Sequence, residues 1–347
     1  MDDAPTMTEA TRWHPVALAD DVAGTPVPVR LLGRDLVLWR PQGSEGPPGA
    51  ADAAEAPRTP VRAWADRCPH RGAKLSLGRV QGERLECPYH GWQFAATGRC
   101  EVVPALPAFV PPATHCAQVF EAREAHGLVW VRLSSTGEAA LPAFEAEHDA
   151  RLRKLNCGPY DVATSAPRIV ENFLDMAHFG FVHEGWLGTR AATAIDDYRV
   201  EPTPTGLRAT QCRAWQPQSN RQSTAPAQVE YTYEVTAPYA AVLTKQPEAG
   251  TVAIDGYRES IALYVCPVEP EKSRVWFRLA VADFASTDDQ LREFQHTIFT
   301  QDQPVLESQT PARLPLDLRA ELHVASDKAS SAYRRFLSQQ GITFGVC

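Results

Sequence analysis

CPHRG (68–72) and CPYHGW (87–92) are two short stretches that each bring a cysteine and a histidine close together. Their candidate sulfur and nitrogen ligands are Cys68 with His70, and Cys87 with His90. Structural zinc is one alternative, but zinc sites usually pair cysteine with cysteine and histidine with histidine within a ligand segment. One sulfur and one nitrogen on each loop instead suit a [2Fe–2S] cluster, in which one iron takes both cysteines and the other takes both histidines.

The second stretch belongs to a longer pattern, LECPYHGWQFAATGRC at 85–100. This pattern resembles the cluster-binding segment of Rieske iron–sulfur domains. Imidazole in place of thiolate makes such a cluster less negative and raises its potential, so it passes electrons on readily. Gly72 and Gly91 allow tight loops whose backbone N–H groups approach the sulfurs. A Rieske electron carrier would need only the first part of the chain, so the remainder requires a further role.

The composition is that of a globular protein and argues against several partners. The chain has 347 residues, enough for two domains, with 44 % hydrophobic and 22 % charged residues. A net charge of −8 argues against nucleic acid, and no apolar run reaches the length of a membrane span. The acidic start, MDDAPTMTEATRWHP, lacks the features of a signal peptide. The eight cysteines do not suggest a disulfide framework, and we expect a cytoplasmic protein.

The chain changes character near residue 145, which predicts an α+β protein with domains at 1–145 and 146–347. The first part holds short alternating segments rich in β-branched and aromatic residues, which predicts an all-β domain. These segments are 27–40, 61–67 and 126–133. The stretch at 41–59 is rich in proline, glycine, alanine and acidic residues, and we expect it to be a flexible insertion.

The second part mixes strands and helices. Strands are expected across 196–282, and helices at 167–186, from Thr287 onward and at 326–340. Ser165 is a candidate cap for the first of these helices. Thr287 and Gln290 predict a capping box for the second, and Pro304 should kink or end it.

A second group of polar side chains lies in ENFLDMAHFGFVH (171–183). Three of them, spaced three residues apart, fall on one face of a helix: Asn172, Asp175 and His178. His183 would point elsewhere in an unbroken helix, so we expect Gly180 to open the helix and let the two imidazoles converge. Two histidines and a carboxylate with open positions form the facial triad of non-haem Fe(II) oxygenases.

The third ligand should be a carboxylate from elsewhere in the chain. Asp302 is a candidate because it lies beside Pro304, where the backbone can turn a side chain inward. The residues alone leave three other carboxylates open: Asp283, Glu293 and Glu307.

Over most of residues 13–340 the chain resembles the oxygenase subunits of Rieske non-haem iron oxygenases, although the insertion at 41–59 departs from their pattern. The family motif Asp-x-x-His-x4-His matches Asp175, His178 and His183. The resemblance also makes Asp302 the third iron ligand. It implies a helix-grip (START/Bet v1-like) catalytic domain, in which an antiparallel sheet curls round a helix over a pocket.

The resemblance further implies how electrons reach the iron. Asp175 would bridge an iron-bound histidine and a Rieske histidine of a neighbouring subunit, so Asp175 and nearby Asn172 are the catalytic candidates. The alternative is that Asp175 is a solvent-exposed carboxylate on the helix surface without a role in electron transfer. We predict a ring-shaped homotrimer in which electrons cross between subunits, because the two metal sites lie in separate domains of one chain. A separate NAD(P)H-dependent reductase or ferredoxin must supply the electrons. The chain has no Gly-x-Gly-x-x-Gly motif for a dinucleotide of its own.

The segment VENFLDMAHFGFVHEGWLG (170–188) is similar to the demethylating branch, which includes methylxanthine N-demethylases and vanillate and dicamba O-demethylases. We therefore predict O2-dependent demethylation or methyl hydroxylation of a small aromatic or heteroaromatic substrate. A ring-hydroxylating dioxygenase and a Rieske electron carrier are the alternatives. Four aromatic side chains could line an apolar pocket or belong to the core: Phe173, Phe179, Phe181 and Trp186.

Overall fold

The computed structural model describes residues 7–42, 59–137, 139–254 and 257–347. Almost all of the predicted insertion at 41–59 therefore lies outside the described residues. The chain divides into two compact units, of which unit 1 holds Ala10–Ala139 and unit 2 holds Ala140–Cys347 together with Met7–Glu9.

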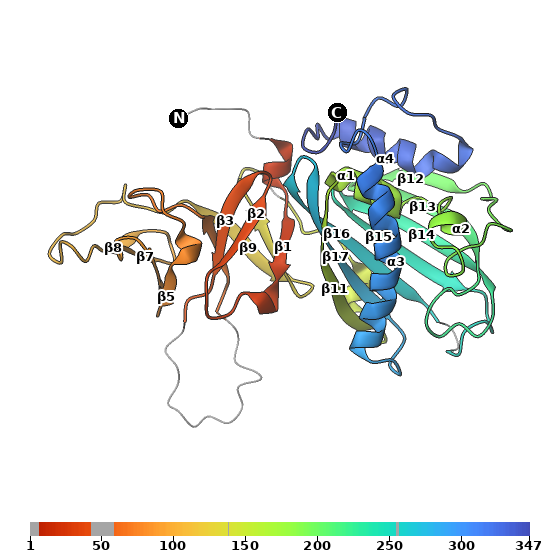
Figure 1. The fold of residues 1–347 in the computed structure, drawn as a ribbon, viewed down its shortest axis with the longest axis horizontal. Helices are drawn as coiled ribbons and strands as arrows, with labels where there is room; N and C mark the ends of the chain where they lie inside the picture. Colours follow the sequence, from red (N-terminus) through yellow and green to blue (C-terminus); the bar gives the residue numbers. More distant parts are fainter. Residues whose placement is uncertain (1–6, 43–58, 138, 255–256) are drawn as a thin grey trace. The chain divides into compact units, whose positions relative to one another are not determined.

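Unit 1 consists of two antiparallel sheets (Figure 1). The larger sheet has six strands in the order β1-β10-β9-β4-β3-β2, and the smaller has four in the order β5-β6-β7-β8. The strands of the larger sheet are β1 (His14–Leu18), β2 (Val27–Leu31), β3 (Arg34–Trp39), β4 (Arg62–Ala65), β9 (Val119–Ala125) and β10 (Leu128–Arg132). Those of the smaller sheet are β5 (Arg79–Gln81), β6 (Arg84–Glu86), β7 (Gln93–Ala95) and β8 (Cys100–Val102).

The core of unit 1 connects the larger sheet to the loops that carry the first motif. Trp39 and Trp64 pack edge to face with ring centroids 5.0 Å apart, and Trp64 contacts Phe94 at 6.5 Å. Cys68 and Cys87 belong to the same buried cluster, each 2 % exposed. The two cysteine loops therefore rest on a packed aromatic core.

Unit 2 is built on one antiparallel sheet of seven strands in the order β11-β17-β16-β15-β14-β13-β12 (Figure 1). The strands are β11 (Arg153–Val162), β12 (Arg199–Thr203), β13 (Gly206–Gln216), β14 (Ala227–Ala237), β15 (Ala240–Pro247), β16 (Glu259–Glu269) and β17 (Lys272–Val281). The helices are α1 (Ala166–Phe173), α2 (Phe179–Val182), α3 (Asp288–Ser308) and α4 (Lys328–Gln339).

Helix α3 crosses one face of this sheet and buries a single stripe of its side chains against it (Figure 1). That stripe is Leu291, Gln295, Phe299, Asp302 and Leu306. Helix α1 packs on β15–β17 and contacts α3, whereas α4 packs on β12 and β13. The predicted α+β fold, an all-β domain followed by an antiparallel sheet with helices, is confirmed. None of the described helices has the length and apolar composition needed to cross a bilayer.

The ends of the helices test three sequence predictions. The capping box is confirmed, since Gln290 N donates to Thr287 Oγ1 at 3.2 Å and Thr287 N donates to Gln290 Oε1 at 2.9 Å. Ser165 occupies the N-cap position of α1 but forms no capping hydrogen bond through its side chain. Pro304 does not end α3, because burial of Leu306 in the core outweighs the backbone hydrogen bond that proline lacks.

The single helix predicted at 167–186 is wrong, because two helices separated by a turn occupy this segment. Helix α1 ends at Phe173, and α2 begins at Phe179. The turn is held by the Asp175 carboxylate, whose Oδ1 accepts a hydrogen bond from Ala177 N at 2.9 Å. A short acceptor side chain of this kind competes with the helical hydrogen bonds of the backbone, which explains the early break.

Gly180 therefore has a different role from the one expected. It lies inside α2, and a Cβ there would come within 2.9 Å of Thr189 O, so glycine allows the following loop to pack closely. Because the break precedes His178, Asn172 on α1 does not share a helix face with Asp175 or His178.

Candidate metal centres

The first candidate centre lies on the two loops of unit 1. The loop after β4 is closed by a hydrogen bond from Gly72 N to Cys68 O at 2.9 Å, and the loop after β6 by one from Gly91 N to Cys87 O at 3.1 Å. The two glycines have φ of +74° and +69°, a region that side chains with a Cβ rarely adopt. Both loops therefore expose their histidines while turning their cysteines inward.

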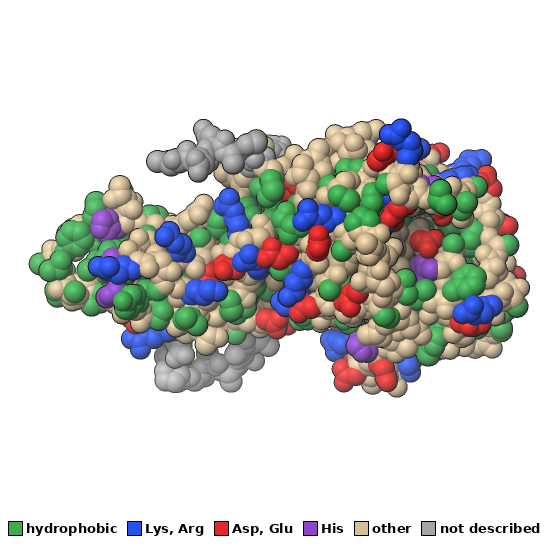
Figure 2. Space-filling model, turned by 45° about the horizontal axis from the view of Figure 1, so that its top comes forward, with side chains coloured by type: hydrophobic (Ala, Val, Ile, Leu, Met, Phe, Trp, Pro, Cys, Tyr) green, Lys and Arg blue, Asp and Glu red, His purple; other side chains and the backbone are tan. Residues whose placement is uncertain are grey.

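The sulfur and nitrogen donors of this centre lie in two separate pairs. Cys68 and Cys87 belong to one buried cluster, and burial, with a smaller contribution from the neighbouring Cys87 thiol, raises the pKa of the Cys68 thiol to about 11. His70 and His90 are exposed, with ring centroids 4.6 Å apart. Figure 2 shows histidine side chains at the surface of unit 1.

This arrangement fits a binuclear cluster better than zinc. Four ligands of one zinc ion would all lie close together around it. Among the described residues, the group of histidine, cysteine and acidic side chains that could hold a single metal ion is His178, His183 and Asp302, and the four residues of these loops do not belong to it. Two sulfurs inside and two imidazoles outside suit the two irons of a [2Fe–2S] cluster.

Two aromatic residues beside this centre were missed by the sequence analysis. Trp92 stacks on His70 with ring centroids 4.3 Å apart and an interplanar angle of 4°. Its ring also stacks on His115 at 5.6 Å. Trp92 is the last residue of the CPYHGW stretch, but nothing in the spacing predicted which histidine it would contact.

Cys87→Ser should remove the visible absorbance of the iron–sulfur cluster and leave the second metal centre intact. The expectation follows because thiolates hold the cluster, whereas the second centre contains no sulfur. Iron analysis and the visible spectrum provide the measurement. Cys100→Ser is the matched control, since Cys100 is buried in the same unit and its Sγ donates a hydrogen bond to Val102 O. Undiminished absorbance in Cys87→Ser would contradict the ligand assignment.

The second candidate centre brings together two histidines from the ends of α2 and an aspartate from α3. One ligand atom from each of His178, His183 and Asp302 lies within 4.8 Å of the others. Asp302 Oδ1 is 3.5 Å from His178 Nε2 and 3.3 Å from His183 Nε2. Figure 2 shows acidic and histidine side chains inside a hollow in unit 2. Two imidazoles and one carboxylate on one side of a cavity suit Fe(II) with open positions.

The outer nitrogens of both histidines are held by side-chain hydrogen bonds. His178 Nδ1 lies 3.0 Å from Asp175 Oδ2, and His183 Nδ1 lies 2.8 Å from Gln301 Oε1. Burial alone would lower the pKa of His178, but hydrogen bonding to Asp175 and the charge of Asp302 outweigh burial and raise it. A proton on each Nδ1 leaves each Nε2 free to bind a metal.

The remaining carboxylates considered from the sequence lie elsewhere. Asp283 is buried and accepts hydrogen bonds from Ser286 and Gln222. Glu307 accepts from Ala163 N at 3.0 Å, and Glu293 is exposed on the outer face of α3. None of these three acids belongs to the group formed with the two histidines.

Asn172 also contacts this centre, since its Nδ2 lies 3.3 Å from Asp302 Oδ1. Gln301 was missed by the sequence analysis, although it precedes Asp302 directly. Its only signal is that adjacency, because the length of α3 that separates it from His183 is fixed by the fold rather than by a local pattern.

Gln301→Leu should weaken iron binding at this centre by about 10- to 100-fold while the cluster remains. The substitution leaves the His183 ring without its acceptor, so neither the orientation of the ring nor its tautomer is held. Titration of the apoprotein with Fe(II) measures the effect. Gln303→Leu is the control on the same helix, since Gln303 bonds Asp161 O and Glu307 instead. Equal iron affinity in both variants would contradict this role.

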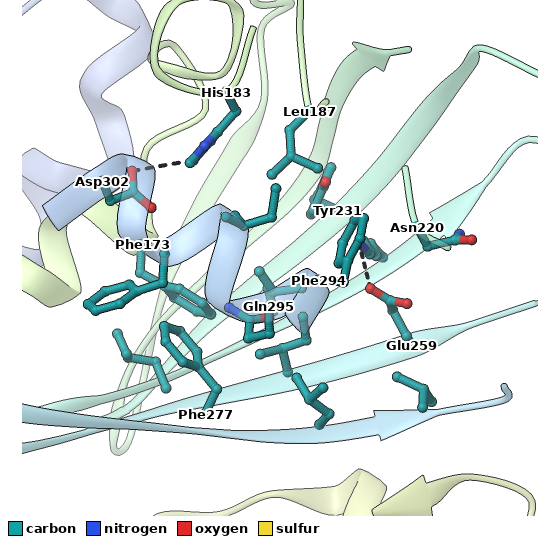
Figure 3. A pocket seen from close by; sticks show the side chains of 18 of the residues that line it. Phe173, His183, Leu187, Asn220, Tyr231, Glu259, Phe277, Phe294, Gln295 and Asp302 are labelled. Carbon is teal, nitrogen blue, oxygen red and sulfur yellow. Dashed lines mark ion pairs between the residues drawn. The ribbon is translucent and has the colours of Figure 1, made fainter. Parts of the chain in front are cut away.

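A pocket extends from the histidines and Asp302 over the face of the sheet (Figure 3). The empty space that it encloses is about 990 Å³, and this volume includes its opening to solvent. Phe173 and Phe179 line it. Phe181, by contrast, is 50 % exposed, and Trp186 packs on Phe294 with ring centroids 5.6 Å apart.

Comparison with known proteins assigns the chain to a family. The Rieske [2Fe-2S] domain matches residues 12–120, and the vanillate O-demethylase oxygenase C-terminal domain matches residues 162–340. The methylxanthine N1-demethylase NdmA of Pseudomonas putida is 33 % identical over 345 residues, which cover 96 % of this chain and 86 % of the relative. The chain belongs to the Rieske non-haem iron oxygenases.

One further relative and one solved structure place this Rieske oxygenase within the family. The probable methylxanthine N7-demethylase NdmC of Pseudomonas sp. (strain TJI-51) is 41 % identical over 226 residues, covering 64 % of this chain and 77 % of the relative. The structure of Pseudomonas putida CBB5 NdmA with caffeine matches with a TM-score of 0.79 at 30 % identity, covering 95 % of this chain and 90 % of that one. The predicted resemblance to the demethylase branch is confirmed.

The predictions of an enzyme, of its reaction class and of its cofactors are also confirmed by this membership. The Rieske oxygenase is a terminal oxygenase of the demethylase branch, with a Rieske [2Fe–2S] cluster, a mononuclear iron and O2 as co-substrate. The cluster supplies electrons one at a time, and the iron activates O2 beside the substrate.

Proposed function

We propose that this Rieske oxygenase removes a methyl group from a nitrogen or oxygen atom of a small aromatic or heteroaromatic compound. The observation that carries the proposal is the pairing of two histidines and Asp302 with a pocket of mainly aromatic and aliphatic side chains. In the reaction, O2, two electrons and two protons convert the methyl C–H bond to C–OH and form one water. The hydroxymethyl group then leaves as formaldehyde, and its proton remains on the nitrogen or oxygen.

Each unit has its own role in this proposal. In the N-terminal domain, predicted at 1–145, the cluster is held by Cys68, His70, Cys87 and His90. In the catalytic domain, predicted at 146–347, Fe(II) is held by His178, His183 and Asp302. Asp175 keeps the His178 ring oriented through the 3.0 Å contact, and Asn172 donates to Asp302. The aromatic walls hold the ring of the substrate and exclude water.

Electrons come from a separate NAD(P)H-dependent reductase or ferredoxin in this proposal, and the oxygenase assembles as a homotrimer. A cyclic trimer has heterologous interfaces, so the Rieske surface of one subunit meets the catalytic surface of the next. The exposed imidazoles of His70 and His90, and the 34 % exposed side chain of Asp175, leave groups available for such an interface. A cytoplasmic location is supported by the eight cysteines, all of which are unpaired.

The experiment supplies the purified protein with electrons and O2 and offers it a panel of N-methyl and O-methyl aromatic compounds. We expect formaldehyde in equal amount to the demethylated product, and about three irons per chain, two in the cluster and one mononuclear. A cis-dihydrodiol without formaldehyde would instead indicate a ring-hydroxylating dioxygenase. About two irons per chain and no O2 consumption would indicate an electron carrier.

A further inference from the structure

One end of the pocket carries a row of polar side chains from three neighbouring strands. Tyr231 on β14 lies opposite Lys245 on β15, and Lys245 lies opposite Glu259 on β16. All three line the pocket, as does Tyr257. In Figure 3, Glu259 lies on the other side of the pocket from His183 and Asp302.

Lys245 and Glu259 form a buried ion pair within this row. Lys245 Nζ lies 2.5 Å from Glu259 Oε1, and the two side chains are 5 % and 6 % exposed. Lys245 Nζ also donates to Ser219 O at 2.6 Å. The other carboxylate oxygen of Glu259 accepts a hydrogen bond from Tyr257 Oη. An ammonium has three N–H bonds, and the described residues provide acceptors for two of them.

The charges at this end of the pocket are balanced. The two remaining charged groups that line it are Arg221, which is exposed, and Asp283, whose carboxylate accepts from Ala285 N, Ser286 and Gln222. With Lys245 and Glu259, this makes two positive and two negative groups. A ligand that reaches this end therefore meets directed donors and acceptors without net charge.

An ion pair in such a place needs a reason other than stability. The desolvation of two buried charges can exceed their mutual attraction, and apolar residues of similar size often stabilise a fold equally well. The strand positions around the pair are apolar, including Leu243, Ile261 and Leu263, and all of these line the same pocket. The pair therefore lies beside strand positions that hydrophobic residues occupy.

We propose that Lys245 donates its remaining N–H to a ring carbonyl oxygen of an uncharged, planar heteroaromatic substrate. This inference rests on the proposed demethylation and narrows its substrate class. Phe173 and Phe294 also line the pocket and provide apolar contacts for a flat ring, and Phe294 lies between Asp302 and Glu259 in Figure 3. A ring carbonyl anchored at Lys245 would leave the opposite edge of the ring, with its methyl group, directed toward His183 and Asp302.

Glu259 determines the charge of the preferred substrate. A carboxylate ligand at Lys245 would place a second anion beside Glu259, and a cationic ligand at Glu259 would face Lys245. Either charge would be desolvated without a partner of its own, which is costly inside a protein. A carbonyl oxygen accepts the hydrogen bond and leaves the ion pair intact.

The test measures ligand binding by calorimetry under nitrogen, on the protein containing both metal centres. The uncharged panel is caffeine, theobromine and N-methyl-2-pyridone, and the anionic probe is 4-methoxybenzoate. We expect the wild-type protein to bind at least one uncharged ligand more tightly than the anion. Glu259→Gln leaves an unbalanced Lys245 cation, so the ratio of anion affinity to uncharged-ligand affinity should rise about tenfold or more.

Two further variants control for structural effects. Glu147→Gln removes one member of the Arg278–Glu147 ion pair, which is 13 % and 20 % exposed and does not line the pocket, and should leave the ratio unchanged. The double variant Lys245→Met with Glu259→Gln removes both charges together, and should lose about tenfold in affinity for the uncharged ligand without gaining anion binding. If Glu259→Gln alone does not fold, the double variant still tests whether Lys245 binds the uncharged ligand.

Three results would overturn the inference. In the first, the wild-type protein binds 4-methoxybenzoate more tightly than every uncharged ligand. In the second, Glu259→Gln folds but the ratio of anion affinity to uncharged-ligand affinity does not change. In the third, the double variant binds the uncharged ligand with wild-type affinity. Binding is measured without turnover, so the two proposals fail separately. A protein that binds the uncharged panel but releases no formaldehyde refutes the proposed function alone. One that demethylates 4-methoxybenzoate but binds no uncharged ligand refutes only the inference.

Discussion

Replacement of a single iron ligand, as in His178→Ala or Asp302→Ala, should abolish turnover and leave the spectrum of the Rieske cluster unchanged. The imidazoles and the carboxylate of this centre lie within 4.8 Å of one another, and two ligands do not hold Fe(II) as three do. The candidate cluster ligands lie in the other unit, where Cys68 and Cys87 belong to a core cluster that contains no residue of this centre. We expect the iron content to fall from about three to about two per chain, and formaldehyde formation to fall to background.

Glu293→Ala is the control for this pair of variants, because Glu293 is an exposed carboxylate on the same helix as Asp302. It should retain all of the iron and the activity. If Asp302→Ala instead kept its mononuclear iron and turned over, another acid such as Glu307 would have to supply the third ligand, and the assignment made here would be wrong.

The second large effect is the recovery of activity when two inactive variants are combined. Cys87→Ser should lack the cluster and His178→Ala should lack the active iron, so each variant should be inactive in the proposed homotrimer. If electrons cross between subunits, roughly one quarter of the interfaces in a random one-to-one mixture pair an intact cluster with an intact iron site. Co-expression with two different affinity tags isolates the mixed trimers, whose formaldehyde formation is then measured.

Activity in the mixed trimers would exclude transfer confined to one chain, because neither chain has both centres. Inactive mixed trimers, once their composition has been verified by mass spectrometry, would refute transfer between subunits. Trimers of each single variant, prepared in the same way, provide the background.

Asp175→Asn tests whether electrons pass through Asp175 at the proposed interface between subunits. Asp175 Oδ2 contacts His178 Nδ1 at 3.0 Å, and its side chain is 34 % exposed, so the carboxylate can accept a second hydrogen bond from a neighbouring subunit. An amide is a poorer acceptor for a histidine proton. We expect both metal centres to remain and the reoxidation of the cluster by O2 and substrate to slow by about 10- to 100-fold. Wild-type rates would show that Asp175 has no part in electron transfer.

The sequence alone indicates those candidate metal sites whose ligands lie close together in the chain. The two Cys–His loops and the two histidines around α2 each fit within a short segment, so their spacing alone indicated metal binding. Asp302 needed the resemblance to the family, because Asp283, Glu293 and Glu307 satisfied the same local criteria. The fold separates them, since only Asp302 occupies the buried stripe of α3 near the histidines.

Two kinds of feature were not predictable: contacts that depend on strand register, and helix ends at which a side chain competes for the backbone hydrogen bonds. Lys245 and Glu259 become neighbours only because β15 and β16 pair in one particular register. The break before α2 arises because Asp175 accepts a hydrogen bond from Ala177 N, whereas the sequence favoured a break at Gly180. Helical periodicity does not reveal either contact.

The most direct test of the central claim is a single turnover by this chain alone. The protein is reduced chemically, freed of excess reductant, and mixed with O2 and an uncharged substrate that carries a trideuterated methyl group. The account predicts doubly deuterated formaldehyde in an amount comparable to the mononuclear iron, together with oxidation of the cluster. Oxidation of the cluster by O2 without any labelled formaldehyde, across the panel of methylated substrates, would contradict it.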